Sequence, residues 1–153
     1  VCSYCFLRKA MIYWCYMRSI PQELKIKKLF AQYGAQFAYL FGSRATGKGK
    51  ISASDYDIAV FFGTGTPQSR FATRLRLMGE LQDLLSPARV DLVVVDDTRS
   101  ATLRYEIVNT GYLIYEKEAG SHIEFEFNVM REYEDFAPFL RAYNQMYIKQ
   151  TSK

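Results

Sequence analysis

Residues 41–62, FGSRATGKGKISASDYDIAVFF, hold the most informative pattern in this sequence. A glycine and a serine follow an apolar run, and after a small polar loop two aspartates open a second apolar run. Residues 42–48 fit the first seven positions of the phosphate-binding loop G-x-x-x-x-G-K-[ST], but Gly49 stands where that loop needs a hydroxyl. That loop also leads into a long helix, whereas only residues 49–54 separate it here from the next strand. The sequence therefore disfavours this loop and indicates a different phosphate site.

The two aspartates have a spacing that suits a shared site. Side chains alternate along a strand, so Asp55 and Asp57 project to one side, about 6.6 Å apart along the backbone. Asp91, in the apolar run RVDLVVV, adds a third carboxylate if the two strands are neighbours, which lie about 4.8 Å apart. Three oxygen ligands suit Mg²⁺, which takes its other ligands from water and nucleotide phosphate. The pattern predicts metal-assisted nucleotidyl transfer, with all three aspartates as catalytic groups and metal ligands.

The residues before the polar loop are the candidates for nucleotide binding. Gly42 and Ser43 would present backbone N–H groups and a hydroxyl to the phosphates. Arg44 or Lys48 would add a positive charge. The alternative for Ser43 is a turn residue without a ligand. We predict that Gly42, Ser43 and Arg44 contact the nucleotide.

The three aspartates also have structural interpretations. Asp55 and Asp57 would otherwise cap the start of a strand and carry a surface charge. Asp91 would otherwise be the buried ion-pair partner of a basic residue such as Arg89 or Arg104. The apolar strand that follows a Gly-Ser loop favours the catalytic interpretation.

Hydrophobic periodicity predicts an α/β protein, with a small mixed sheet and helices packed against it. Ser19 and Thr98 are the expected N-caps of two helices, and Pro138 is expected to kink the last one. The strand at 89–95 has the composition of a central strand, and the strand at 112–116 that of an edge strand. Helices are expected at residues 19–33, 67–86, 98–109 and 121–149, and strands at 35–41, 55–62, 89–95 and 112–116.

Length and composition indicate one soluble globular domain. The 153 residues are 49% hydrophobic, and 20 basic against 16 acidic residues give a net charge of +4, which suits small phosphate ligands as well as RNA. We expect residues 1–18 to be an N-terminal extension and residues 19–153 to be the functional domain. Charged residues interrupt the extension, so a membrane span is not expected. It also lacks a basic region ahead of its apolar stretch and a clear small-residue cleavage site, so a secretory signal is not expected either. The chain has three cysteines, all within the extension, and we expect free thiols in a reducing cytoplasm.

These motifs resemble a known superfamily. Gly-Ser followed by D-x-D, with a third carboxylate on a later strand, is the signature of the nucleotidyltransferases related to DNA polymerase β. More closely, FGSRATG, SDYDIAV, RVDLVVVDD and LRYEIVNTGYLIYE resemble the minimal nucleotidyltransferases, the MntA-type antitoxins paired with HEPN toxins. The resemblance covers residues 20–147. Eleven residues separate Ser43 from Asp55, one more than is usual in this family, and loops absorb such insertions.

The resemblance implies a polymerase β-like fold with a long C-terminal helix and a defined activity. This activity is the transfer of AMP from ATP, with two Mg²⁺ ions, to a hydroxyl of a HEPN RNase toxin, typically a tyrosine. It also implies a cytoplasmic hetero-oligomer with a toxin dimer, and no direct contact with nucleic acid or membrane. Two alternatives stay open, an antitoxin that neutralises by binding alone and a nucleotidyltransferase for small molecules. The intact Gly-Ser and aspartates speak against the first, and the lack of an added acceptor domain speaks against the second.

The C-terminal helix carries more large apolar residues than one core-facing stripe requires. The surplus lies around Phe127, Tyr143 and Tyr147. We expect a partner protein to dock there.

Overall fold

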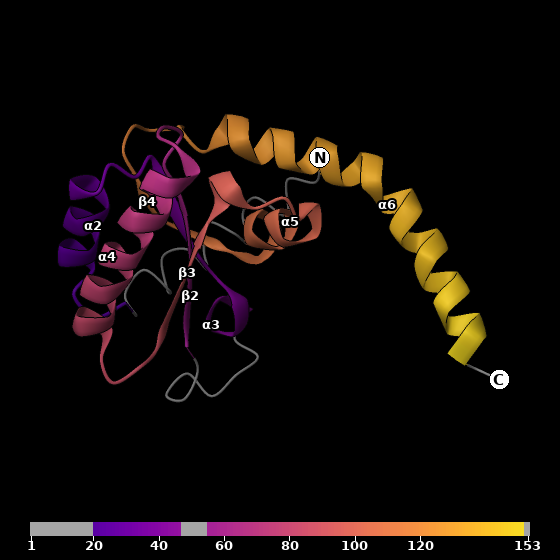
Figure 1. Cartoon of the computed structure of the whole chain (residues 1–153), viewed down its shortest axis with the longest axis horizontal. Coiled ribbons are helices and arrows are strands. Elements are labelled where there is room, and N and C mark those ends of the chain that lie inside the picture. Colours follow the sequence, from indigo (N-terminus) through magenta and orange to yellow (C-terminus); the bar gives the residue numbers. More distant parts are fainter. Residues whose placement is uncertain (1–19, 47–54, 152–153) are drawn as a thin grey trace.

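A four-stranded mixed sheet forms the centre of the fold (Figure 1). The structure is a computed structural model that describes residues 20–46 and 55–151, with side chains described as far as residue 141. The strand order is β3-β2-β1-β4, with β1 antiparallel to both of its neighbours and β3 parallel to β2. The predicted α/β class is confirmed. The strands are β1 (Phe37–Phe41), β2 (Tyr56–Phe61), β3 (Val90–Val94) and β4 (Tyr112–Glu116).

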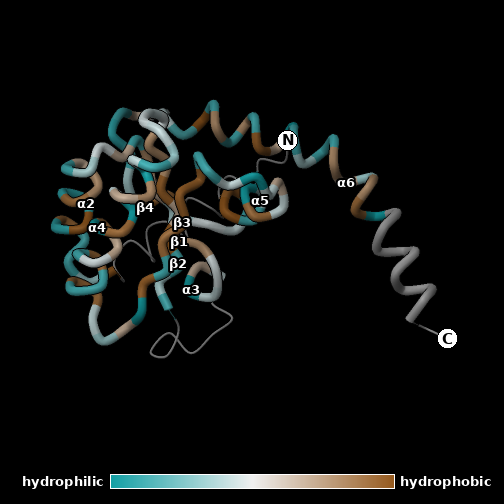
Figure 2. Tube along the Cα trace, viewed as in Figure 1, coloured by the Kyte–Doolittle hydropathy of each residue, from teal (hydrophilic) through white to brown (hydrophobic). Residues whose placement is uncertain are grey.

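Helices cover both faces of this sheet. One face packs against α2 (Glu23–Gln32) and α4 (Pro67–Leu85), and the other packs against α5 (Ala101–Thr110) and the start of α6 (Ile123–Thr151). A short helix, α3 (Gly42–Thr46), directly follows β1. Figure 2 shows hydrophobic residues concentrated on the strands, while hydrophilic residues alternate with them along the helices.

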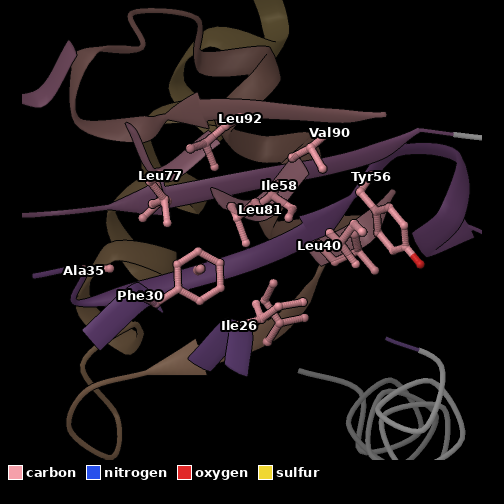
Figure 3. Packing of buried hydrophobic residues seen from close by; sticks show 14 of the residues in the cluster. Ile26, Phe30, Ala35, Leu40, Tyr56, Ile58, Leu77, Leu81, Val90 and Leu92 are labelled. Atoms are coloured by element: carbon pink, nitrogen blue, oxygen red, sulfur yellow. The ribbon is translucent and has the colours of Figure 1, made fainter. Parts of the chain in front are cut away.

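Two spacings in the sequence produce these layers. In β1, Leu40 packs toward α2 and α4, whereas its neighbours Tyr39 and Phe41 pack toward α5, as alternation along a strand requires. Helix α4 presents leucines to the sheet at intervals of four residues, so that one face of the helix is buried (Figure 3). Burying each such side chain stabilises the fold by about 1.5–3 kcal/mol. The buried leucines of α4 are Leu77, Leu81 and Leu85.

The predicted starts of two helices were wrong. Helix α2 begins at Glu23, after Gln22 in the left-handed conformation, so it does not start at Ser19, which lies outside the described residues. Helix α5 is capped by Ser100, whose side chain accepts a hydrogen bond from the Leu103 N–H. Thr98 does not cap α5, because a 3₁₀ turn follows β3 and the Thr98 hydroxyl donates to the carbonyl of Val94.

The predicted central position of β3 was also wrong, because among the described strands β3 and β4 are the two edge strands. Its apolar composition has another cause, which is that helices cover both of its faces. The side chain of Arg74, from α4, donates to the Leu92 carbonyl at 2.5 Å. This contact covers part of the backbone at the open edge of the sheet.

The last helix is long, and it continues through Pro138. Figure 1 shows that α6 bends along its length and that its C-terminal half leaves the sheet behind, as the predicted kink would require. Within the described parts of the chain, no helix is both long enough and apolar enough to cross a membrane.

Candidate active site

The predicted site residues meet at one end of the strands, where β1 ends and β2 and β3 begin. Because β2 and β3 both run opposite to β1, the end of β1 lies beside the starts of β2 and β3. The strand register pairs Asp57 with Phe41 on one side and with Asp91 on the other. The structure therefore brings together Asp91, the D-x-D segment and the two residues at the start of α3, Gly42 and Ser43, which we call the Gly-Ser turn.

Alternation places two of the carboxylates on the same face. Ile58 and Leu92 pack against α2 and α4, so Asp57 and Asp91, each one residue earlier, project toward the face that α5 covers. Asp57 is half-buried, whereas the side chain of Asp91 is 65% exposed at the sheet edge. Asp55 is exposed and precedes the first residue of β2. The site thus contains one sheltered carboxylate between two open ones.

Gly42 makes room for the sheltered carboxylate. Its φ is 71°, and a Cβ built on it would lie 2.1 Å from Oδ2 of Asp57, which no side chain tolerates. The next residue, Ser43, donates its backbone N–H to the same carboxylate, and its side chain is exposed. The turn that was predicted to hold phosphate therefore also holds Asp57. Nucleotide contact by Gly42 and Ser43 stays a prediction.

The pKa of Asp57 is raised above its ordinary value. Burial is the largest cause, followed by repulsion from Asp91 and from Asp55, while the Ser43 N–H acts in the opposite direction. Glu106, on α5, adds a smaller repulsion. Sequence reasoning missed Glu106, because a charged residue on a helix gives no signal until the fold brings it near the aspartates. Negative charge therefore accumulates here, and a cation would relieve it.

The donor chemistry of these residues fits a hard divalent cation. Carboxylate oxygens are what Mg²⁺ prefers, and proteins commonly hold it through one or two carboxylates together with substrate phosphate. Across residues 20–46 and 55–141, no group of three or more acidic, histidine or cysteine side chains is arranged so that it could hold a metal ion by itself. The residues therefore fit a cation shared with a nucleotide better than one held by protein alone. Ligation by Asp55, Asp57 and Asp91 stays a prediction.

The ion-pair partner of Asp91 is not one of those that the sequence suggested. Its carboxylate lies 3.9 Å from the guanidinium of Arg74, and Arg104 instead pairs with Glu132 at 2.7 Å. Asp91 is too exposed to be half of a buried ion pair, so that alternative was wrong. An exposed pair at this distance contributes at most about 1 kcal/mol, which leaves the Asp91 carboxylate available for chemistry.

Arg44 lies against the D-x-D segment. It is only 8% exposed, its Nε donates to the carbonyl of Asp55 at 3.1 Å, and its guanidinium carbon lies 3.8 Å from the centre of the Tyr56 ring. Its role as a nucleotide contact stays a prediction. Lys48, the other candidate cation, lies outside the described residues.

Replacing Gly42 by alanine is expected to lower the free energy of unfolding by about 1–3 kcal/mol, because the new methyl group meets Asp57 and the backbone is left-handed. Chemical denaturation monitored by circular dichroism measures the change. Gly79→Ala is the matched control, since nothing lies within 4 Å of a Cβ there, and this variant should gain about 0.5–1 kcal/mol from helix propensity. Equal effects of the two substitutions would contradict the packing of Gly42 on Asp57.

The raised pKa of Asp57 predicts a pH-dependent effect of Asp57→Asn. An acid whose folded pKa is raised contributes stability at low pH that is lost as the pH rises, so ionised Asp57 destabilises the metal-free protein at neutral pH. The asparagine variant should therefore unfold at higher denaturant than the wild type at about pH 7, with a difference that shrinks toward about pH 4. Denaturation in a chelating buffer tests this, with the exposed Asp135→Asn as control. A wild type more stable than Asp57→Asn at neutral pH would refute it.

Comparisons with known proteins agree with this geometry. The family model described as "Polymerase beta, Nucleotidyltransferase" matches residues 24–120. No curated protein sequence matches the chain.

Several solved structures are similar over most of the chain. A toxin–antitoxin complex with AMP-PNP contains a chain 27% identical, with a TM-score of 0.63, covering 86% of this chain and 99% of that one. A MntA–HpeT mutant complex is 25% identical with a TM-score of 0.64, over 86% and 99% of the two chains. A tri-AMPylated Shewanella oneidensis HEPN toxin in complex with MNT antitoxin is 25% identical with a TM-score of 0.56, over 86% and 96%.

The similarity to MntA-type antitoxins and the polymerase β-like fold that the motifs suggested are therefore confirmed. The matched region contains both the Gly-Ser turn and all three aspartates. The chain belongs to the polymerase beta nucleotidyltransferase family.

Proposed function

We propose that this chain is an antitoxin that transfers AMP from ATP to a hydroxyl of a HEPN toxin and thereby neutralises it. The observation that carries the proposal is the Gly-Ser turn packed on Asp57, with Asp91 beside it in register. Support comes from similar proteins, which were solved with AMP-PNP and with an AMPylated HEPN toxin. We take a tyrosine as the acceptor and the cytoplasm, where ATP is plentiful, as the compartment.

The reaction is an in-line displacement at the α-phosphorus of ATP. The acceptor oxygen forms a bond to this phosphorus, the bond to the β-phosphate oxygen breaks, and pyrophosphate leaves. Asp91 would accept the hydroxyl proton, because its open position at the sheet edge can meet a side chain from another protein. Sheltered Asp57 is poorly placed for that task.

Asp55 and Asp57, with Asp91, would hold Mg²⁺ in this site. When bound, Mg²⁺ neutralises the triphosphate and helps to position the attacking hydroxyl, and two ions divide these tasks in related chemistry. The Gly42 and Ser43 segment, with its exposed hydroxyl, lies beside Asp57 and would face the phosphates. Arg44 adds positive charge to this edge of the sheet.

We also propose that the toxin, as a dimer in a hetero-oligomer, docks along α6. Phe127 and Phe139 are 65% and 71% exposed, and α6 packs on α5, which contacts α3 at the site. A toxin on α6 would therefore lie on the same side of the sheet as the aspartates. The side chains of Tyr143 and Tyr147, which were expected to take part, lie outside the described ones.

The double variant Asp55→Ala/Asp57→Ala is expected to abolish AMP transfer while leaving the fold intact, because it removes the carboxylates without touching the core. Intact-mass spectrometry of a HEPN toxin incubated with this protein, ATP and Mg²⁺ measures the transfer as a gain of one or more AMP units. Asp83→Ala/Glu118→Ala removes the same charge from exposed positions outside α6 and should transfer like the wild type. A stable complex with no mass gain would favour neutralisation by binding alone.

Phe139→Ser is expected to weaken toxin binding at least about tenfold, since a central aromatic contact contributes about 2 kcal/mol or more to an interface. Isothermal titration with the toxin measures the dissociation constant. Phe71→Ser is the matched control, because Phe71 is 56% exposed but lies on α4, across the sheet from the site. If Phe71→Ser weakened binding as much as Phe139→Ser, docking along α6 would be wrong.

A further inference from the structure

Among the residues that the structure describes, Arg44 is the only charged one that is buried. A guanidinium removed from water costs free energy unless hydrogen bonds or aromatic contacts compensate for it. A residue that served only to meet solvent-borne phosphate would have a mostly exposed head group. The burial of Arg44 therefore indicates that its main interactions are with the protein itself.

Two of its contacts fall on one short segment. The Nε of Arg44 donates to the Asp55 carbonyl at 3.1 Å, and the guanidinium lies over the ring of Tyr56. Tyr56 is the middle residue of D-x-D, and its ring is buried in the core. Arg44 therefore touches the residues that carry and separate the two aspartates.

The segment also needs such support. The pairing of β2 with β1 ends at Asp57, and its pairing with β3 begins at Tyr56, so Asp55 lies beyond both ladders. The Tyr56 N–H donates to the carbonyl of Arg89 at 2.7 Å, while the Asp55 carbonyl accepts from Arg44. The peptide unit between Asp55 and Tyr56 is thus held at both of its polar groups, one by the residue that precedes β3 and one by a residue of α3.

We propose that Arg44 is a positioning residue that sets the backbone of Asp55 and so the spacing of the two D-x-D carboxylates. It acts through the Asp55 carbonyl and the Tyr56 ring. This inference rests on the proposed function, because it concerns carboxylates that serve nucleotidyl transfer. Arginine combines an Nε–H donor with a flat, charged group that stacks on the ring, whereas lysine carries a compact ammonium and no flat group.

Loss of this support is expected to lower the rate of the chemical step. Displacing a reactive group by about 1 Å can lower a rate about 100-fold, even when substrate still binds. A direct phosphate contact would behave differently, since its loss weakens nucleotide binding, and lysine would replace it in part. The two roles therefore separate in kinetics.

Arg44→Lys tests the proposal, with AMP transfer to a HEPN toxin followed at varied ATP. We expect kcat to fall between about 10- and 100-fold while the KM for ATP stays within about threefold. Binding of Mn²⁺ alone, followed by electron paramagnetic resonance, should also weaken in the variant. Arg70→Lys is the matched control, because Arg70 pairs with Asp97 in the turn after β3, at the opposite end of the strands from the site. This variant should change neither the kinetic constants nor Mn²⁺ binding.

A raised KM with an unchanged kcat would assign Arg44 to the phosphates and overturn the proposal, as would unchanged values of both. A wild type that transfers no AMP would refute the proposed function instead, and Mn²⁺ binding would then decide the role of Arg44. Circular dichroism checks folding. If Arg44→Lys is unfolded, Tyr56→Leu, which removes the ring under the guanidinium and keeps an apolar side chain in the core, should show the same pattern to a smaller degree.

Discussion

The approach of Gly42 to the Asp57 carboxylate is the contact on which the site depends. The absence of a side chain at Gly42 lets the turn close over Asp57, and the Ser43 N–H then satisfies the carboxylate. Burial and like charges raise the pKa of this group, so the turn stabilises an arrangement that electrostatics opposes. A sheltered anion of this kind is suited to a cation that arrives with its substrate.

The sheet topology explains why the turn and all three aspartates share one edge. Because β2 is antiparallel to β1, it starts where β1 ends. The crossover through α4 makes β3 parallel to β2, so β3 starts at the same end of the sheet. Helix α4 also covers the outer edge of β3 through Arg74, within reach of Asp91. The antiparallel pairing thus places Asp57 beside the end of β1, and the parallel pairing places it beside Asp91, which is 34 positions later in the sequence.

The two faces of the sheet have different tasks. The face under α2 and α4 carries the larger apolar cluster and secures the strands. The other face holds a smaller cluster and carries Asp57 and Asp91, and Glu106 of α5 lies near Asp57. Beyond the sheet, α6 extends with exposed aromatic residues. An open third carboxylate beside a protruding apolar helix suits an acceptor as large as a protein.

Local patterns were enough to predict the order of elements and the bounds of β4, because hydrophobic periodicity and alternation are local properties. It also indicated the family, since Gly-Ser and D-x-D are read at fixed spacing. The tertiary structure was needed to show that β3 is an edge strand among the described strands and that Ser100 caps α5. It was also needed to show that Arg44 packs on Tyr56 and that Arg74 and Glu106 lie near the aspartates. These depend on contacts between distant segments, and a charged residue carries no periodic signal of the partner that folding will bring to it.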